Sequence, residues 1–141
     1  MTTLYSTTVN AVGGRGGHVK STDGILDVGL ALPEGLGGKG GATNPEQLFA
    51  AGYAACFGNA VIHVTRKSDH KIRDNDVTVA ATVGLVPGAG GGFALTVALE
   101  VILAVVDQAT AEAIVADAHK VCPYSNATRG NIDVAISVKT Q

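Results

Sequence analysis

The chain has 141 residues and a mass of 14.2 kDa, which suits one domain with a sizeable core and is short of two. Its hydrophobic share is 46% with only 4% aromatic residues, so Ala, Val, Leu and Ile supply most of the apolar volume. A net charge of -2 and a pI near 6.0 provide no basic field, which argues against nucleic acid and anionic lipid as partners. We expect a single domain over residues 1–141.

The opening residues lack the basic region and apolar run of a secretory signal, so we expect a cytoplasmic protein. The most apolar stretch, residues 48–64, contains Asn59 and His63 and is short and polar for a membrane span of about 20 residues. We interpret it as a buried helix and expect no membrane association. Two cysteines in a reducing compartment are typical of reactive or redox-active thiols, and two inert buried thiols are an equal alternative on count alone.

Three β-rich segments at 4–12, 18–22 and 26–32 are separated by Gly or Asp-Gly, which predicts a small antiparallel meander. The Gly-rich loop PEGLGGKGGAT follows. Neither Gly cluster favours phosphate binding. The segment GGRGG lacks the G-x-G-x-x-G spacing, and Lys39 is followed by Gly40 where a phosphate loop needs Ser or Thr.

A helix is predicted from Asn44 to about Lys67. Asn44 can cap it, Pro45 takes the first helical position, and Gln47 completes a capping-box pattern. The charged run RKSDHKIRDND ends the helical pattern.

Two long alternating segments, 77–86 and 93–105, are joined by PGAGGG and predict a hairpin. Residues 107–121 have helical spacing with Asp107 as a cap, and a final strand is expected at 132–138. The resulting order is β-β-β-α-β-β-α-β. We therefore expect an α+β fold with mainly antiparallel sheets and two main helices.

Cys56 lies in the middle of the first predicted helix among small residues, where nothing local lowers the pKa of a thiol. It needs a cation from elsewhere to become a nucleophile. Arg15 is the candidate because four flanking glycines allow a close backbone approach, and a solvated turn arginine is the alternative. Glu46, in the first helical turn, suits the helix dipole and could hold a guanidinium by two bonds. About 15 Å of straight helix separates Glu46 from Cys56.

Cys122 precedes Pro123, which must end or redirect the second helix, so this sulfur can move more readily than one inside a helix. His119 and Cys122 are also spaced i, i+3, as in some zinc sites. The remaining two ligands would be Cys56 and His63, which lie about 10.5 Å apart along one helix and cannot both reach one ion. A cysteine-protease site needs a general base and a group that orients it. The four histidines are scattered along the sequence, and nothing singles out one of them as that base.

The segments NPEQLFAAGYAACF at 44–57 and VCPYSNATRGNIDV at 121–134 resemble the two signatures of the organic hydroperoxide resistance proteins, within the osmotically inducible protein C family. The resemblance covers the whole chain. It implies an intertwined homodimer with two active sites at the subunit interface, and reduction of organic hydroperoxides by a dithiol, typically lipoyl groups. By matching motif it assigns the four catalytic positions. These are the peroxidatic Cys56, the resolving Cys122, and the assisting pair Arg15 and Glu46.

The implied mechanism is attack of the Cys56 thiolate on the hydroperoxide, closure of a Cys56–Cys122 disulfide, and reopening by a dithiol such as a lipoylated protein. It needs no metal, flavin or heme. Alkyl and fatty-acid hydroperoxides would gain burial energy that hydrogen peroxide lacks. The aromatic side chains expected to bind them are Phe49, Tyr53, Phe57 and Phe93. A redox sensor and a structural zinc domain are the two other classes, but the sensor would need a DNA-binding helix or basic face that the sequence does not show.

Overall fold

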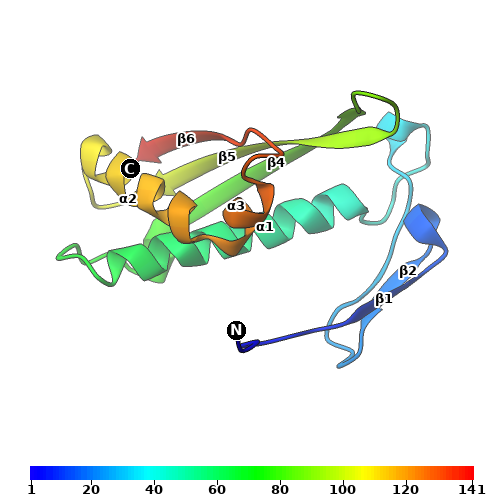
Figure 1. Ribbon diagram of the computed structural model, residues 1–141, viewed down its shortest axis with the longest axis horizontal. Helices are drawn as coiled ribbons and strands as arrows, with labels where there is room; N and C mark the ends of the chain where they lie inside the picture. Colours follow the sequence, from blue (N-terminus) through cyan, green and yellow to red (C-terminus); the bar gives the residue numbers. More distant parts are fainter. The chain divides into compact units, whose positions relative to one another are not determined.

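The computed structural model describes residues 1–141, which form two compact units, Met1–Leu48 and Phe49–Gln141. Together they contain two three-stranded sheets and three α-helices, an α+β arrangement (Figure 1). The long helix α1, Pro45–Thr65, begins in the first unit and continues through the second.

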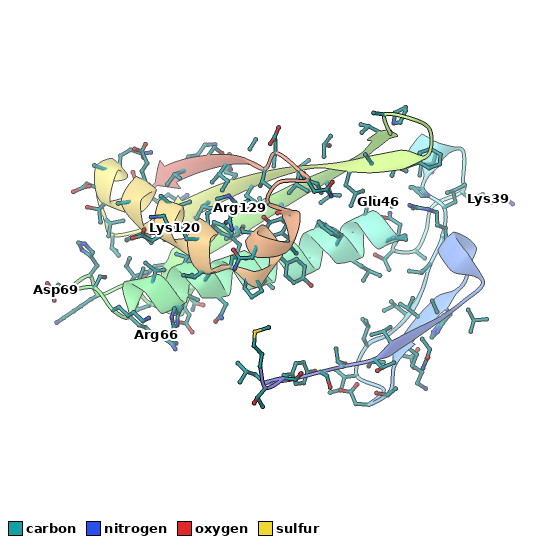
Figure 2. The ribbon with its side chains drawn as sticks, in the orientation of Figure 1. Lys39, Glu46, Arg66, Asp69, Lys120 and Arg129 are labelled. Carbon is teal, nitrogen blue, oxygen red and sulfur yellow. The ribbon has the colours of Figure 1, made fainter.

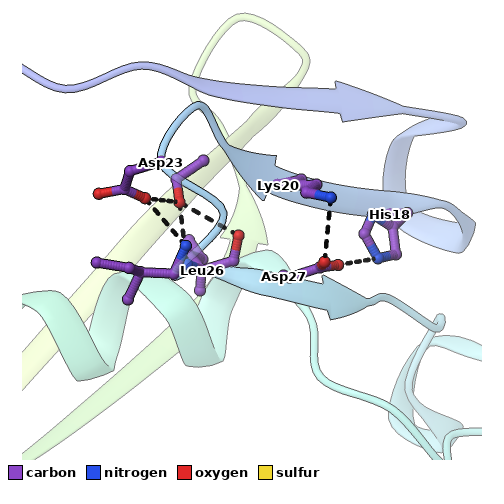
Figure 3. Close-up of polar contacts among 7 residues, drawn as sticks. His18, Lys20, Asp23, Leu26 and Asp27 are labelled. Carbon is purple, nitrogen blue, oxygen red and sulfur yellow. Dashed lines mark hydrogen bonds and ion pairs between the residues drawn. The ribbon is translucent and has the colours of Figure 1, made fainter.

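The first unit is built on an antiparallel sheet in the order β1-β2-β3, with strands Val9–Val12, His18–Ser21 and Asp27–Gly29. Two short 3₁₀ helices, Gly14–Gly16 and Glu34–Leu36, lie in its connections. Figure 3 shows Asp27 between His18 and Lys20, with His18 Nε2 2.8 Å from one carboxylate oxygen. At the β2–β3 turn, Asp23 accepts from the Ser21 hydroxyl at 2.6 Å. The predicted meander is confirmed, with shorter strands.

The second unit contains the hairpin and the remaining helices. Strands β4 (Val77–Pro87) and β5 (Phe93–Leu103) pair antiparallel along their full length, which confirms the hairpin. Strand β6 (Ala135–Thr140) pairs parallel to β5, so this sheet is mixed. A 3₁₀ turn, Asp74–Asp76, leads into β4.

One face of this sheet carries the core. The alternate residues Val97, Leu99, Val101 and Leu103 of β5 are buried, because successive side chains of a strand point to opposite faces. They pack with the buried faces of α1 and of α2 (Gln108–Val121) in a single cluster, and Figure 1 shows α1 running along the sheet. The α1 side chains in that cluster are Tyr53, Phe57, Ala60 and Val61. The apolar stretch predicted as a buried helix therefore supplies a large part of the core.

Helix ends follow the sequence signals with one correction. The Asn44 side chain accepts from the backbone N–H of Gln47 at 2.9 Å, and the Asp107 side chain accepts from Thr110 at 2.8 Å. The reciprocal half of the predicted capping box is wrong, because the Gln47 side-chain oxygen accepts from the Thr43 hydroxyl. Helix α1 ends at Thr65, two residues before the predicted end.

A third helix, α3 (Pro123–Thr128), was not predicted. The expectation was that Pro123 ends a helix, but proline also suits the first turn of a new one, and here it does both. The turn after α3 places Gly130 at a φ of 82°, and the amide of Ile132 bonds back to the Thr128 carbonyl at 2.8 Å. The final strand therefore begins at Ala135, three residues later than predicted.

By length and composition alone α1 could cross a membrane, with a mean hydropathy of 1.4 over its most apolar segment. A core helix of the same composition meets that criterion equally, and α1 carries part of the core. Only 28% of that segment is buried in this chain, however. Much of the apolar surface of α1 is therefore uncovered.

Candidate active site

The two cysteines, 66 residues apart in sequence, lie together in the second unit. Cys122 is fully buried at the end of α2, and its thiol points at the half-buried Cys56 of α1 across 3.8 Å between sulfurs. A disulfide needs about 2.0 Å, so a movement of about 1.8 Å separates the reduced pair from a bond. Both thiols are free here, and they are close enough for direct reaction.

The environment of Cys56 disfavours its thiolate. Burial raises the pKa of Cys56, and the neighbouring Cys122 thiol adds to the increase. The backbone N–H of Tyr124, in the first turn of α3, lowers the same pKa by bonding to the sulfur, but it does not overcome burial. Tyr124 is far from Cys56 in sequence, so this effect does not contradict the expectation that no neighbouring residue of the helix lowers the pKa of Cys56. Within the Phe49–Gln141 unit, no cation acts on this thiol.

In the first unit, Arg15 and Glu46 form a two-bond ion pair. The guanidinium donates from Nη1 to Glu46 Oε2 at 2.7 Å and from Nη2 to Glu46 Oε1 at 2.5 Å. These bonds raise the pKa of Arg15 and lower the pKa of Glu46, whose side chain is 15% exposed. Figure 2 shows Glu46 in the first turn of α1. The structure thus joins the two residues that the sequence proposed as a pair.

The glycines around Arg15 permit the tight backbone turn that carries this residue. A side chain at Gly17 would place its Cβ in direct collision with the Val12 carbonyl oxygen, so only glycine allows β1 and β2 to close there. Gly13 has a φ of 83° in the same turn. Arg15 is therefore held on a tight 3₁₀ turn, with its fork fixed at the other end by Glu46.

A mostly apolar cavity of about 560 Å³ lies in the second unit, within the size range of small-molecule sites. Its lining residues are Phe49, Leu85, Phe93, Ala94, Leu95, Tyr124, Ala127, Thr128, Asn131 and Ile132. Tyr124 links this cavity to the thiols, because it lines the wall while its backbone N–H lowers the pKa of Cys56. The ring also lies against Gly52, where an added Cβ would be 2.7 Å from the tyrosine oxygen.

The four aromatic residues predicted to bind substrate divide into two groups. Phe49 and Phe93 line the cavity. Tyr53 and Phe57 do not, because both are fully buried among α1, α2 and β5 and belong to the core of this chain. The cavity residue that sequence reasoning missed is Tyr124, which the C-P-Y-S motif contains but whose orientation depends on α3.

The four residues of the zinc alternative do not come together as a ligand set, although Cys56 and Cys122 are neighbours. No group of three or more His, Cys, Asp or Glu side chains is arranged to hold a metal ion. His119 is committed elsewhere, with its Nδ1 2.8 Å from the Ser125 hydroxyl. Burial, followed by the nearby Arg129, lowers the pKa of His119, which favours the neutral ring. His63 is exposed near the end of α1.

The sequence profile of the OsmC-like protein family matches residues 38–137, and the chain belongs to that family. An organic hydroperoxide resistance protein of Xanthomonas axonopodis pv. citri (strain 306) is 46% identical over 138 residues, covering 96% of this chain and 94% of the relative. Among solved structures, the organic hydroperoxide resistance protein OsmC of Legionella pneumophila is 53% identical, with a TM-score of 0.93 and coverage of 98% and 99% of the two chains.

The organic hydroperoxide resistance protein of Elizabethkingia anophelis is 45% identical, with a TM-score of 0.94 over the full length of both chains. These relatives cover 96% to 100% of the chain, so the similarity is not confined to the two cysteine segments. The resemblance read from the two sequence signatures is confirmed at the level of the family.

Proposed function

We propose that this protein is a two-cysteine thiol peroxidase that reduces organic hydroperoxides to alcohols. The observation that carries the proposal is the 3.8 Å approach of the Cys122 thiol to the Cys56 sulfur. Cys56 is the partly accessible member of the pair and Cys122 the fully buried one. The peroxide therefore reaches the Cys56 thiol first, and the buried Cys122 thiol reacts in a later step. The names of the relatives agree with this chemistry.

In the proposed cycle, the Cys56 thiol first loses its proton, and the thiolate attacks the distal oxygen of ROOH. An S–O bond forms and the O–O bond breaks, which leaves a sulfenic acid on Cys56, and the alkoxide takes up the proton and leaves as ROH. The Cys122 sulfur then attacks the sulfenic sulfur. An S–S bond forms, the S–O bond breaks, and the hydroxyl leaves as water with the thiol proton. A dithiol reopens the disulfide by exchange and is itself oxidised to a disulfide. Lipoyl groups are the dithiol that we propose, on the basis of the family resemblance.

The first step needs a cation, since burial raises the pKa of Cys56. We assign this cation to Arg15, with Glu46 as the carboxylate that fixes the guanidinium fork. Glu46 beside a thiolate without Arg15 would oppose it by like charge, so its useful task is positioning. Arg15 also stabilises the charge that develops on the departing oxygen.

We propose that Arg15 and Glu46 of one chain serve Cys56 of another in a homodimer. Helix α1 is continuous, so ten residues of rise keep Glu46 about 15 Å from Cys56 of its own chain. Two features favour a second chain. The first unit buries only Val19 and Leu30 among its apolar side chains, too few for an independent core. Helix α1 has a large uncovered apolar surface.

We propose that the 560 Å³ cavity accepts the organic part of the hydroperoxide. Apolar and aromatic side chains supply most of its wall, and Tyr124 connects it to the reactive sulfur. An alkyl or fatty-acid tail in that cavity gains about 0.8 kcal/mol for each buried methylene, whereas hydrogen peroxide gains nothing. The chemistry also needs a compartment that keeps dithiols reduced, so we place the protein in the cytoplasm.

A steady-state assay tests the proposal: cumene hydroperoxide with dihydrolipoamide, run beside hydrogen peroxide and beside glutathione. We expect turnover to be fastest with the organic peroxide and the dithiol. After one turnover without reductant, mass spectrometry should find a Cys56–Cys122 disulfide. No consumption of any hydroperoxide by the reduced protein would refute the proposal, and consumption without the disulfide would refute the role of Cys122.

A further inference from the structure

Beneath the corner between α2 and α3 lies a buried group of polar side chains centred on Ser125. Ser125 is fully buried. Its hydroxyl is 3.0 Å from the Tyr53 hydroxyl and 2.8 Å from His119 Nδ1. One serine of α3 is therefore bonded both to α1 through Tyr53 and to α2 through His119. No buried side-chain polar atom of the protein lacks a partner, so this group is fully satisfied.

Helix α3 depends on such contacts for its position. It has six residues, too few for a stable helix without tertiary support. Thr128 adds a second contact, with its hydroxyl 3.2 Å from the Tyr53 hydroxyl and 3.2 Å from the Ser125 carbonyl. Arg129, which Figure 2 shows beside α2 and α3, donates to the His119 carbonyl at 2.5 Å. The short helix is thus fixed by polar bonds on two sides.

The corner that these bonds hold carries two groups that act on the Cys56 sulfur. One is the Cys122 thiol, 3.8 Å from that sulfur, and the other is the backbone N–H of Tyr124, which lowers the pKa of Cys56. Ser125 is the next residue in the chain, and the Asn126 amide bonds to the Cys122 carbonyl at 3.0 Å. A shift of Ser125 therefore moves both groups relative to Cys56.

We propose that Ser125 is a positioning residue for the closing of the Cys56–Cys122 disulfide, acting through its bonds to Tyr53 and His119. This inference rests on the function proposed above. In the step concerned, the Cys122 sulfur bonds to the Cys56 sulfur of the sulfenic acid, the S–O bond breaks, and the thiol proton leaves with the hydroxyl as water. A second hydroperoxide competes for the same sulfenic acid and converts it to sulfinic acid, releasing another alcohol.

This competition supplies a measurable quantity. The fraction of Cys56 that ends as disulfide, and not as sulfinic acid, reports how well Cys122 is placed when the sulfenic acid forms. A residue that acts only on the general stability of the fold changes this fraction no more than any other buried substitution. A residue that positions the corner changes the fraction while the first oxidation of Cys56 proceeds at its normal rate.

The test uses Ser125→Ala and Tyr53→Phe, which remove hydroxyls from the two ends of one bond. Thr65→Val is the matched control, because Thr65 is 2% exposed on α1 and its hydroxyl bonds only locally, to the Ile62 carbonyl. Each reduced protein receives excess cumene hydroperoxide without reductant. Stopped-flow kinetics give the first oxidation, and mass spectrometry gives the products at Cys56.

We expect Ser125→Ala to raise the ratio of sulfinic acid to disulfide by at least about tenfold, since misplacements near 1 Å cost about a hundredfold in positioned reactions. Tyr53→Phe should raise it in the same direction, and Thr65→Val should match the wild type. A wild-type ratio in Ser125→Ala, or an equal rise in Thr65→Val, overturns the inference. Where Ser125→Ala fails to fold, Tyr53→Phe decides by the same criterion. If the wild-type protein forms no disulfide, the proposed function itself is refuted. That outcome is distinguishable from failure of the inference about Ser125, which is seen only when the variants are compared with a wild type that does form the disulfide.

Discussion

The apolar cavity predicts a dependence of rate on the length of the hydroperoxide tail. Each methylene that enters it gains about 0.8 kcal/mol if fully buried, and 1.4 kcal/mol is tenfold, so kcat/KM should rise about fourfold per methylene. A tail that is only half buried reduces the factor to about twofold. A straight-chain series extended by four methylenes should therefore gain roughly 15- to 250-fold.

The assay is consumption of a homologous series of primary alkyl hydroperoxides with dihydrolipoamide, and with hydrogen peroxide as the compound without a tail. Leu85→Ala shortens a side chain of the cavity wall and should reduce kcat/KM for the longest substrate by about fivefold, or about 1 kcal/mol. Val86→Ala is its control, because the neighbouring residue of β4 points to the opposite face and does not line the cavity. Equal rates across the series, or the same loss in both variants, would refute this account of the cavity.

Three further predictions concern the thiols, the assembly and pH. Cys56→Ser should consume no hydroperoxide, whereas Cys122→Ser should consume one equivalent and stop as sulfenic or over-oxidised Cys56; intact-mass analysis checks this, and the reverse pattern would exchange the two roles. Co-refolding Cys56→Ser with Arg15→Ala should restore activity in heterodimers, because one site then combines Cys56 with the partner chain's intact arginine; activity no higher than in the two parents would mean that each site is built within one chain. Burial lowers the pKa of His119 in the folded protein, so as pH falls below about 6.5 this histidine takes up a proton in the unfolded chain before it does so in the folded one. The free energy of unfolding should therefore decrease as pH falls from about 6.5 to the pKa of His119 in the folded protein. Urea unfolding at several pH values should show a weaker pH dependence of the free energy of unfolding in His119→Gln. The control His63→Gln, at an exposed position, should keep the wild-type dependence.

Local signals along the chain were sufficient for much of the fold. The Asn44 and Asp107 caps, the PGAGGG turn and the alternation of the two long strands depend on neighbouring residues only, and each appears in the structure. The failures came where a local signal has two readings. Pro123 can end one helix or start another, and the Gln47 oxygen can accept from its own helix or from Thr43. The sequence also could not distinguish Phe49, which lines the cavity, from Tyr53 and Phe57, which are buried in the core, because all three lie on one helix.

The sequence by itself determined the family, the two cysteine segments and the pairing of Arg15 with Glu46, because motif identity and charge complementarity are properties of residue type. Only the tertiary structure decided that Cys122 lies 3.8 Å from Cys56, that the Tyr124 amide lowers the pKa of that thiol, and that Ser125 joins three helices beneath them. The physical reason is that these contacts join residues 66 to 72 positions apart, or depend on a six-residue helix that forms only when packed. No local propensity encodes a contact of that kind, since its geometry is set by how the helices pack on the sheet.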